Sequence, residues 1–406
     1  MKVVILTQYF YPEVGAAQNR LMALARAFKS RDHDITVLTS LPNYPTGEIF
    51  REYSHCYKAR EEIDGIPILR SWLYVHKSRA TIPTVLSYLT FAATCLDIGR
   101  REIKKADLVL WEFPPIFLGY TAMKLAHIWK AKIVTNIADV WTRMIGEHKI
   151  FVPKAILRQF EKYESKLYRK SLMITGQTEG ILREIKKNAP WSEPILWPNG
   201  ADPDHFCPRK PSQELTERYN PENRFVIGYA GLHGRNHNLR LILDTADVLR
   251  DENSLLFLFF GDGFEKESLK AYAKKLKLTN VQFHDPVPYP DLPEILSLFD
   301  TGIVIHRNLP GLKSARSAKL FELMAMGIPI LHCAESEGAE IIRRAGAGEI
   351  VADDDPRKVA ETILRMKDSG YLSKSGKNGR SFVKDNFDRK RISAEIVRKI
   401  EEAVRA

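Results

Sequence analysis

One stretch of this 406-residue chain combines cations and a carboxylate with the expected start of a helix. It runs from Gly311 to Pro329 and reads GLKSARSAKLFELMAMGIP. Lys313, Arg316 and Lys319 precede or open the helix, and its candidate N-caps are Ser314 and Ser317. Amides and positive charge at a helix start attract phosphate oxygens. Glu322 follows about one turn later, where a carboxylate can accept two hydrogen bonds from a ribose diol. The spacing fits a pyrophosphate and ribose site and a surface helix with an ordinary Lys319–Glu322 pair equally well.

Glycine-containing loops follow an expected strand in each half of the chain and lead into an expected helix. The first loop contains Gly15, and the second, GLHGRNH over residues 231–237, contains Gly231, Gly234 and Arg235. Small residues allow a ligand to approach the backbone closely. Neither loop has the G-x-G-x-x-G or the P-loop pattern. Each loop alone therefore indicates little more than a turn.

The elements that must position these residues form a regular series. Apolar β-runs alternate with helix-period segments, a pattern that predicts an α/β fold built on parallel sheets. We expect strands at residues 1–7, 34–39, 66–71, 108–111, 132–136, 173–175 and 194–197, then at 225–230, 255–260, 281–284, 301–305 and 328–332. Helices over 19–30 and 239–249 follow the glycine loops. Pro198, Pro203 and Pro208 separate the two series, so we predict two facing, doubly wound domains joined at a hinge.

Composition and charge narrow the class of protein. With 44% hydrophobic and 27% charged residues, the chain is neither disordered, nor collagen-like, nor a disulfide scaffold. Its four cysteines lie far apart, and its first residues are too short a run for a signal peptide, so we expect a cytoplasmic protein. Residues 1–200 hold 29 Lys and Arg against 19 Asp and Glu, a balance of +10 within a net +11. That excess favours an anionic partner such as nucleic acid, a phospholipid surface or a phosphorylated substrate. The alternative is that the basic residues only keep the protein surface soluble.

Two segments invite other interpretations. Residues 80–96 carry no charge but are too poor in apolar residues to span a bilayer, so they predict a buried helix or, because Arg100, Arg101, Lys104 and Lys105 follow, an interfacial one. The acidic run 353–355 precedes Pro356 and a helical pattern. Acidic residues favour a helix N-terminus, so this run predicts a helix start rather than a metal site.

Several motifs resemble those of the retaining glycosyltransferases of family 4, the group 1 glycosyl transferases with the GT-B fold. Residues 195–208, ILWPNGADPDHFCP, are similar to the interdomain signature of that family, and residues 261–263 and 320–329 are similar to its GDG turn and E-x-M-A-x-G-x-P helix. Residues 8–13, 41–45 and 139–141 resemble the subset that builds bacterial O-antigen, capsule and exopolysaccharide. The resemblance implies two Rossmann-like domains with an interdomain cleft. An acceptor-binding domain would span 1–195 and be completed by a helix at about 385–406, and a nucleotide-sugar-binding domain would span 196–384.

The resemblance also implies an activity, its partners and its site residues. A UDP- or GDP-linked sugar would be transferred with retention to an acceptor hydroxyl of a glycan or of a polyprenyl-pyrophosphate-linked sugar. The +10 balance of residues 1–200 and the uncharged segment 80–96 favour an anionic inner membrane surface as a further partner. We expect no cofactor, no nucleic acid and, because an acidic metal motif is missing, no metal. The expected catalytic residues are Asp139, Lys319 and Arg235. The expected donor-binding residues are Gly15, Gly231, Gly234, His237, Ser317, Leu320 and Glu322. The expected acceptor-binding residues are Glu13, Asn43, Tyr44 and Trp141.

This chain departs from the family pattern at several positions. The first of the two family glutamates falls on Ser314, and the usual Arg and Lys of the second-domain loop fall on Leu232 and His237. We therefore expect Arg235 and Lys319 to compensate the phosphate charge. The family also has a histidine in its first domain, and the corresponding position in this chain falls in the region of Asp139. Two alternatives stay open: a nucleotide-sugar epimerase on the same scaffold, and a basic nucleic-acid-binding protein, although no helix-turn-helix or zinc motif is present. A dinucleotide oxidoreductase is disfavoured because its glycine fingerprint is missing.

Overall fold

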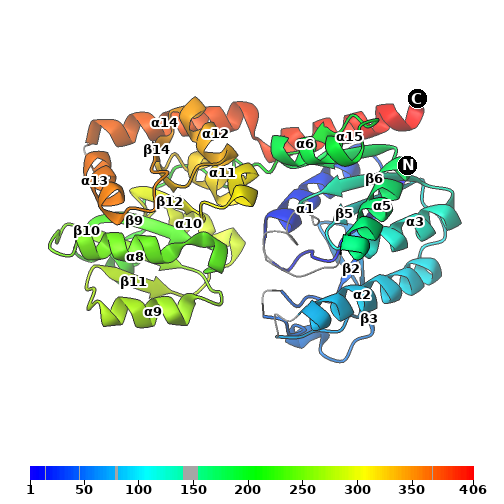
Figure 1. The fold of residues 1–406 in the computed structure, drawn as a ribbon, viewed down its shortest axis with the longest axis horizontal. Coiled ribbons are helices and arrows are strands. Elements are labelled where there is room, and N and C mark those ends of the chain that lie inside the picture. The colour runs from blue at the N-terminus through cyan, green and yellow to red at the C-terminus, as the bar shows by residue number, and fades with distance from the viewer. Residues whose placement is uncertain (14, 45, 78–80, 140–153, 368) are drawn as a thin grey trace. The chain divides into compact units, whose positions relative to one another are not determined.

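The computed structural model describes residues 1–13, 15–44, 46–77, 81–139, 154–367 and 369–406. These residues form two compact units, each built around its own sheet (Figure 1). Unit 1 contains Met1–Pro198 and Arg389–Ala406, and unit 2 contains Asn199–Asp388. The domain ends expected from the sequence, residues 195 and 384, compare with 198 and 388 in the structure.

Unit 1 contains a mostly parallel sheet. Its strands are β1 (Lys2–Leu6), β2 (Asp34–Ser40), β3 (Lys58–Ile63), β4 (Ile66–Ser71), β5 (Leu108–Phe113), β6 (Lys132–Ile137), β7 (Met173–Gly176) and β8 (Ile195–Leu196). They are ordered β3-β4-β2-β1-β5-β6-β7-β8, and only the edge strand β3 is antiparallel to its neighbour. Strands β1 and β5 are buried along nearly their whole length. Their sequences are continuous apolar runs because both faces of the sheet are covered.

Helices cover both faces of this sheet. The described helices of unit 1 are α1 (Ala16–Lys29), α2 (Thr81–Glu102), α3 (Leu118–Trp129), α5 (Lys154–Lys170), α6 (Glu179–Asn188) and α15 (Arg389–Arg405), with a short 3-10 turn, η1 (Arg51–Tyr53). Helices α1 and α15 pack in one core cluster, and α2, α3, α5 and α6 pack in another. Two layers of helices on a parallel sheet are the doubly wound arrangement that the sequence predicted.

The last helix of the chain belongs to the first unit. Helix α15 packs against α1 (Figure 1). Arg31 and His33, which follow α1, reach Glu401 of α15 at 2.6 and 2.7 Å. Hydrogen bonds from these two side chains lower the pKa of Glu401 to about 2.

Unit 2 has a fully parallel sheet. Its strands are β9 (Phe225–Ala230), β10 (Leu255–Phe260), β11 (Val281–His284), β12 (Thr301–Ile305), β13 (Ile330–Cys333) and β14 (Gly348–Ile350), in the order β11-β10-β9-β12-β13-β14. Its described helices are α7 (Gln213–Tyr219), α8 (Leu239–Val248), α9 (Lys266–Lys275), α10 (Leu292–Leu296), α11 (Ala318–Ala325), α12 (Glu337–Ala345), α13 (Pro356–Met366) and α14 (Ser369–Asn386). Short 3-10 turns are η2 (Arg235–His237), η3 (Tyr289–Asp291) and η4 (Pro310–Ser314). One core cluster includes α8, α9 and α13, and a second includes α10, α11, α12 and α14.

The structure confirms the expected strands and corrects some details. The sequence prediction missed β3 and β14, which are both edge strands. Strand β3 reads KAREEI and alternates between exposed and half-buried residues, so it lacks the apolar run of a central strand. Helix α1 begins at Ala16, three residues before the expected start at Asn19. Asp355 caps α13 by accepting a hydrogen bond from the backbone of Arg357, as the acidic run predicted.

Helix α2 has one buried face and one exposed apolar face. Phe91 and Cys95 are fully buried in the core. Three apolar side chains on its other face are exposed by 82%, 43% and 45%: Ile82, Leu86 and Leu89. Within the described residues, α2 is the helix that is long and apolar enough to cross a membrane, judged by length and composition alone. Core helices of soluble proteins meet the same criteria, so this finding is weak evidence for a span.

Candidate functional site

The strand order of the unit 2 sheet reverses between β9 and β12. Strands β9, β10 and β11 follow one another to one side, and β12, β13 and β14 to the other. Open parallel sheets bind ligands outside the carboxyl ends of their strands at such a point, because the loops diverge there. The backbone N–H of Arg307, after β12, donates to the carbonyl oxygen of Asn236, after β9, at 2.8 Å. The topology therefore brings these loops to one edge of the sheet.

Glycines allow the loops after β9 and β10 to pack backbone against backbone. Gly261 has a φ of +141°, and a β-carbon there would lie 1.9 Å from the carbonyl oxygen of Gly231. Gly231 has a φ of +147°, and a β-carbon there would lie 2.8 Å from Nζ of Lys319. Side chains rarely tolerate such backbone conformations. The structure therefore explains why the expected donor-binding residue Gly231 has no side chain, since any other residue would displace the ammonium group.

Lys319 lies on the first turn of α11 against an aromatic ring. Its Nζ is 3.9 Å from the ring centroid of Tyr229, whose hydroxyl donates to the carbonyl oxygen of Leu232 at 2.7 Å. Burial lowers the pKa of Lys319 to about 7, although the carboxylate of Glu322 opposes the shift. A charge that is poorly solvated interacts more strongly with an incoming anion. This environment fits the expected role of Lys319.

The remaining residues of α11 divide between the site and the core. Ser317 is the N-cap of the helix, and its side chain makes no capping hydrogen bond. Glu322 lies almost one turn after Lys319 and is 7% exposed. Leu320 is fully buried in the core, so only its backbone is available to a ligand. Arg316, a nearby cation, pairs with Glu337 at 2.8 Å and is not placed to neutralise a ligand without breaking that pair.

The loop after β9 carries the expected residues Gly234, Arg235 and His237. The carbonyl oxygen of Gly234 accepts a hydrogen bond from the backbone of His237 at 2.9 Å. Burial, followed by the nearby Lys319 charge, lowers the pKa of His237 to about 3, so its ring is neutral at pH 7. Arg235 is exposed. The position that carries a family lysine thus holds an uncharged imidazole in this chain.

Two further histidines at this edge were not among the site residues expected from the sequence. His233 is fully buried, and burial lowers its pKa to about 4. His306 directly follows β12 and is 8% exposed, and burial also lowers its pKa. His306 lies where an apolar β-run ends, and His233 lies in the loop that follows another such run. A titratable side chain at such a position was the signal available in the sequence.

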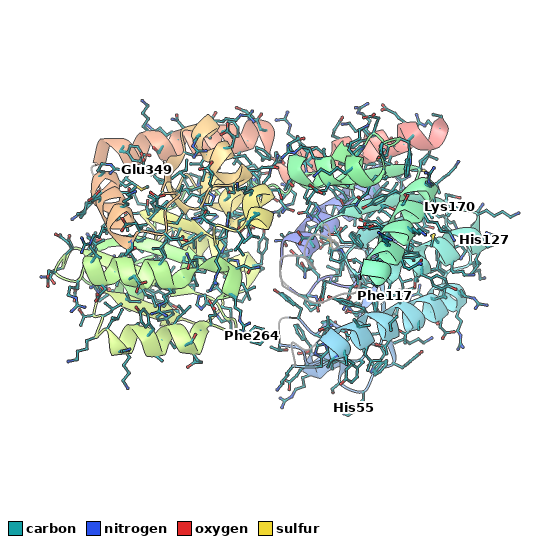
Figure 2. All side chains as sticks on the ribbon, viewed as in Figure 1. His55, Phe117, His127, Lys170, Phe264 and Glu349 are labelled. Carbon is teal, nitrogen blue, oxygen red and sulfur yellow. The ribbon has the colours of Figure 1, made fainter. Side chains whose placement is uncertain are left out.

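The loop after β10 also presents an aromatic ring. Phe264 directly follows the GDG turn, is 64% exposed and projects from the surface of unit 2 (Figure 2). An exposed aromatic ring offers a flat apolar face for stacking. Phe264 was not among the residues expected from the sequence.

In unit 1, the strand order reverses between β1 and β5, and the loop after β1 carries Glu13 and Gly15. Glu13 is 1% exposed and accepts hydrogen bonds from the backbone N–H groups of Phe10, Asn43 and Tyr44 at 3.1, 2.8 and 2.9 Å. Burial raises the pKa of Glu13 to about 7, although these bonds oppose the shift. Glu13 therefore joins two loops, and a contact with an acceptor stays a prediction. Gly15 is the N-cap of α1, with an extended backbone.

The expected acceptor-binding residues Asn43 and Tyr44 line a cavity of about 180 Å³ in unit 1. Tyr9 lies beside them, with its ring centroid 5.6 Å from that of Tyr44 in an edge-to-face arrangement. The other lining residues are Gly47, Val75, His76, Thr84, Ser87 and Tyr88. Trp141 lies outside the described residues.

Asp139 is exposed after β6, close enough to Arg20 for their charges to interact. Arg20 is buried and donates to Glu112 at 2.5 Å, and Glu112 accepts from Asn136 at 2.5 Å. The side chain of Asn136 in turn accepts from Thr175 at 2.7 Å. A carboxylate inside the apolar run LVLWEF was the sequence signal for this network. The network fixes the strand ends that support Asp139.

Comparisons with known proteins identify a family domain and similar folds. Residues 224–369 match the family described as Glycosyl transferases group 1. The chain is 22% identical over 412 residues to the putative colanic acid biosynthesis glycosyl transferase WcaI of Escherichia coli K12, covering 98% of this chain and 100% of WcaI. Sucrose-phosphate synthase from Thermosynechococcus elongatus matches with a TM-score of 0.76 at 13% identity, covering 99% of both chains. HepE from Anabaena, solved with UDP-glucose, matches with a TM-score of 0.72 at 15% identity, covering 99% of this chain and 100% of HepE.

The matched family domain lies within unit 2, the unit that contains the Lys319 site. The similar structures extend over nearly the whole chain and share its two-sheet α/β architecture. The protein is therefore a glycosyltransferase with the GT-B fold and a group 1 glycosyl transferase domain.

Proposed function

We propose that this enzyme transfers a sugar from a UDP- or GDP-linked donor to an acceptor hydroxyl, with retention of the anomeric configuration, during surface polysaccharide synthesis. The observation that carries the proposal is the cluster at the β9–β12 edge, where Lys319, Glu322 and the Gly231 loop converge. A diphosphate against Lys319 and the start of α11 would leave Glu322 for the ribose hydroxyls. The similarity to WcaI, a putative colanic acid biosynthesis glycosyl transferase, supports the polysaccharide context.

The leaving nucleoside diphosphate gains negative charge as its bond to the sugar breaks. Cations and amide donors that already point at this oxyanion stabilise the transition state more than the ground state, by about 2–4 kcal/mol for each donor. Lys319 and the first amides of α11 are suited to this task, with Arg235 as a further cation. They supply charge compensation without a metal ion. Asp139 would orient sugar or acceptor hydroxyls.

Thermal-shift screening against UDP, GDP, ADP and their sugars tests the donor. A ligand that binds only the folded state raises its apparent stability according to its concentration and affinity. HepE was solved with UDP-glucose, so we expect UDP compounds to be among those that stabilise the protein. If no nucleotide changes the melting temperature, the proposed donor site is wrong.

Product analysis with and without an acceptor tests the reaction class. Transfer requires an acceptor, so no new nucleotide-sugar should accumulate when the acceptor is absent. Formation of an epimeric nucleotide-sugar under those conditions would replace transfer by epimerisation. The anomeric configuration of the transferred product, determined by NMR, tests retention.

We further propose that the acceptor is a lipid-pyrophosphate-linked sugar, bound at the cytoplasmic face of the membrane. Helix α2 supplies Thr84, Ser87 and Tyr88 to the cavity that Asn43 and Tyr44 line. The same helix exposes its apolar stripe, Ile82, Leu86 and Leu89. The cavity is therefore adjacent to a surface suited to the interfacial region of a bilayer. The +10 balance of residues 1–200 favours anionic lipid by about 1 kcal/mol for each basic residue near the surface.

Sedimentation with anionic vesicles tests this attachment. We expect binding at low salt that weakens at high salt, and weaker binding when Ile82, Leu86 and Leu89 are all replaced by Gln. Exposed Ile128 on α3 offers a matched control, because Ile128→Gln removes an exposed apolar side chain away from the stripe. Absence of binding by the parent at low salt would contradict the proposal.

A further inference from the structure

Three histidines at the β9–β12 edge have buried ring nitrogens without hydrogen-bond partners among the described residues. Neither Nδ1 nor Nε2 of His233 has a partner, and the same holds for Nδ1 of His237 and Nε2 of His306. Buried polar atoms in native proteins are nearly always paired, so each exception needs an explanation. A neutral imidazole carries one N–H group, and Nδ1 of His306 already donates its proton to the carbonyl oxygen of Arg307 at 3.1 Å. His233 and His237 can therefore each offer one N–H group to a ligand with acceptor oxygens.

Other histidines of unit 2 show that this pattern is not general. His332 bonds the carbonyl oxygen of Val304 at 2.8 Å and Oγ of Ser336 at 3.0 Å. His284 bonds the side chain of Gln282 at 3.1 Å. These partly or fully buried imidazoles find partners within the fold. The unpaired nitrogens belong to the edge where the strand order reverses, where a ligand is expected on topological grounds.

Two of the imidazoles lie near the ring of Tyr229, and the third, His306, interacts electrostatically with His237. The ring centroids of His233 and His237 lie 5.8 and 6.4 Å from that of Tyr229, and Nζ of Lys319 lies 3.9 Å from it. His237 interacts electrostatically with Lys319, His306 and His233. Residues from β9, from its loop, from the loop after β12 and from α11 thus form one cluster.

Charged and titratable groups face this cluster from every element packed against it. Cations dominate among them, and the buried groups pay a desolvation cost when they are charged. These groups are Lys319 and Glu322 on α11, Asp262 after β10, Lys266 and Lys270 on α9, His332 on β13, Tyr229 on β9 and the exposed Arg235 on η2. Lys266 is itself paired with Asp285 at 2.9 Å.

We propose that His233 and His237 each donate a ring N–H group to the donor diphosphate, and that Lys319 takes up a proton from solvent as the diphosphate binds. This inference rests on the proposed function, because it requires a nucleotide-sugar in the same site. In the empty site, burial disfavours a proton on Lys319, although the carboxylate of Glu322 opposes this effect. The diphosphate brings the negative charge that makes the protonated amine favourable. The imidazoles stay neutral and supply hydrogen bonds in place of the usual family cations.

The size of the proton uptake follows from the environment of Lys319. With a pKa of about 7, Lys319 is roughly one-tenth protonated at pH 8 in the empty site. Full protonation in the complex then corresponds to an uptake of roughly 0.9 proton at pH 8, and of about 0.1 proton at pH 6. Because binding consumes a proton, affinity rises as pH falls, by about fivefold from pH 8 to pH 7.

Isothermal titration calorimetry measures this uptake directly. The probe is the nucleotide-sugar that gives the largest thermal shift, because its diphosphate is a diester with no ionisable proton near neutral pH. Titrations in buffers of different ionisation enthalpy give the number of protons taken up at pH 6 and pH 8. The intact chain is used throughout. We expect uptake of roughly one proton at pH 8 and almost none at pH 6.

Three variants separate the roles. Lys319→Met should abolish the uptake. His237→Leu removes the N–H donor and should weaken binding by about tenfold or more, since hydrogen bonds to charged groups are strong, while the uptake remains. His284→Leu is the matched control, because this histidine lies in the same unit but has a partner in the fold. It should change neither quantity. The melting temperature of each free variant verifies that it folds.

The outcomes distinguish this inference from the function on which it rests. Binding without proton uptake at pH 8, or uptake that persists in Lys319→Met, would overturn the inference and leave the proposed function intact. If His233→Leu and His237→Leu both fold and bind like the parent, the role of the histidines is wrong. If no nucleotide-sugar binds, both proposals fail.

Discussion

Replacing Lys319 by methionine should make the empty enzyme more stable, although the enzyme loses a binding residue. The ammonium group of this lysine packs against the ring of Tyr229 and against the backbone of Gly231, and burial lowers its pKa to about 7. Methionine has a similar unbranched length and no charge to desolvate. The substitution therefore removes an electrostatic cost while keeping most of the packing.

The magnitude follows from proton linkage. In the unfolded chain a lysine keeps a pKa of about 10.4, and each unit of pKa difference is worth about 1.4 kcal/mol. Between the folded pKa of about 7 and the unfolded value, the unfolded state binds more protons, so the stability of the parent rises with pH. The cost of burying this lysine is about 4 kcal/mol at pH 7 and about 2 kcal/mol at pH 9. Loss of the contact with the Tyr229 ring offsets about 0.5–2 kcal/mol of the gain.

Urea unfolding of the parent and of Lys319→Met at pH 7 and pH 9 tests this reasoning. All six tryptophans (Trp72, Trp111, Trp129, Trp141, Trp191 and Trp197) lie in the part of the sequence that belongs to unit 1. Circular dichroism should therefore show the stabilisation of unit 2. The unfolding transition followed by tryptophan fluorescence, called the tryptophan transition below, reports on unit 1 and should stay unchanged. We expect the variant to be more stable by about 2–3 kcal/mol at pH 7, with an advantage that shrinks by about 2 kcal/mol at pH 9.

An exposed lysine of the same stretch provides the control. Lys313 lies in η4 with an exposed side chain, so Lys313→Met should change neither transition at either pH. A Lys319→Met variant that is less stable than the parent at pH 7, or whose advantage grows with pH, would refute the argument from desolvation.

The other predictions concern both units. Glu13→Gln removes a carboxyl whose pKa is raised to about 7, so the unfolded state binds fewer protons between about pH 4.5 and 7. Relative to this variant, the parent should lose about 2 kcal/mol of stability from pH 5 to pH 7 in urea titrations, and a pH-independent difference would contradict the shift. Arg20→Met leaves Glu112 buried without its counter-ion and should cost about 3–5 kcal/mol, whereas the double variant with Glu112→Leu should lose less than the sum of the singles. Additive losses in the tryptophan transition would show that the pair is not coupled. Glu322→Ala should weaken nucleotide binding by about tenfold or more in calorimetry, with Glu340→Ala on α12 as control, and unchanged affinity would remove Glu322 from the site.

Much of the fold could be predicted because local patterns and global architecture agree. Central strands such as β5 and β10 are continuous apolar runs, since helices cover both faces of the sheet. The edge strands β3 and β14 escaped prediction for the same physical reason. They have one free side and few buried residues, so their sequences lack that signature.

The sequence by itself determined which residue types could handle a diphosphate: a lysine and a carboxylate on α11, and glycines after β9. Helix spacing fixes Lys319 and Glu322 relative to each other, because both lie within the same short helix. These are local relationships, so no knowledge of tertiary contacts was needed.

Only the tertiary structure decided the protonation and the neighbours of these groups. His306 is distant in sequence from His233 and His237, and the parallel pairing of β9 with β12 brings its loop beside theirs. The low pKa of Lys319 arises from burial against Tyr229 and the Gly231 loop. Desolvation depends on all atoms around a charge, most of which come from other elements of the chain, and spacing along the sequence carries no record of them.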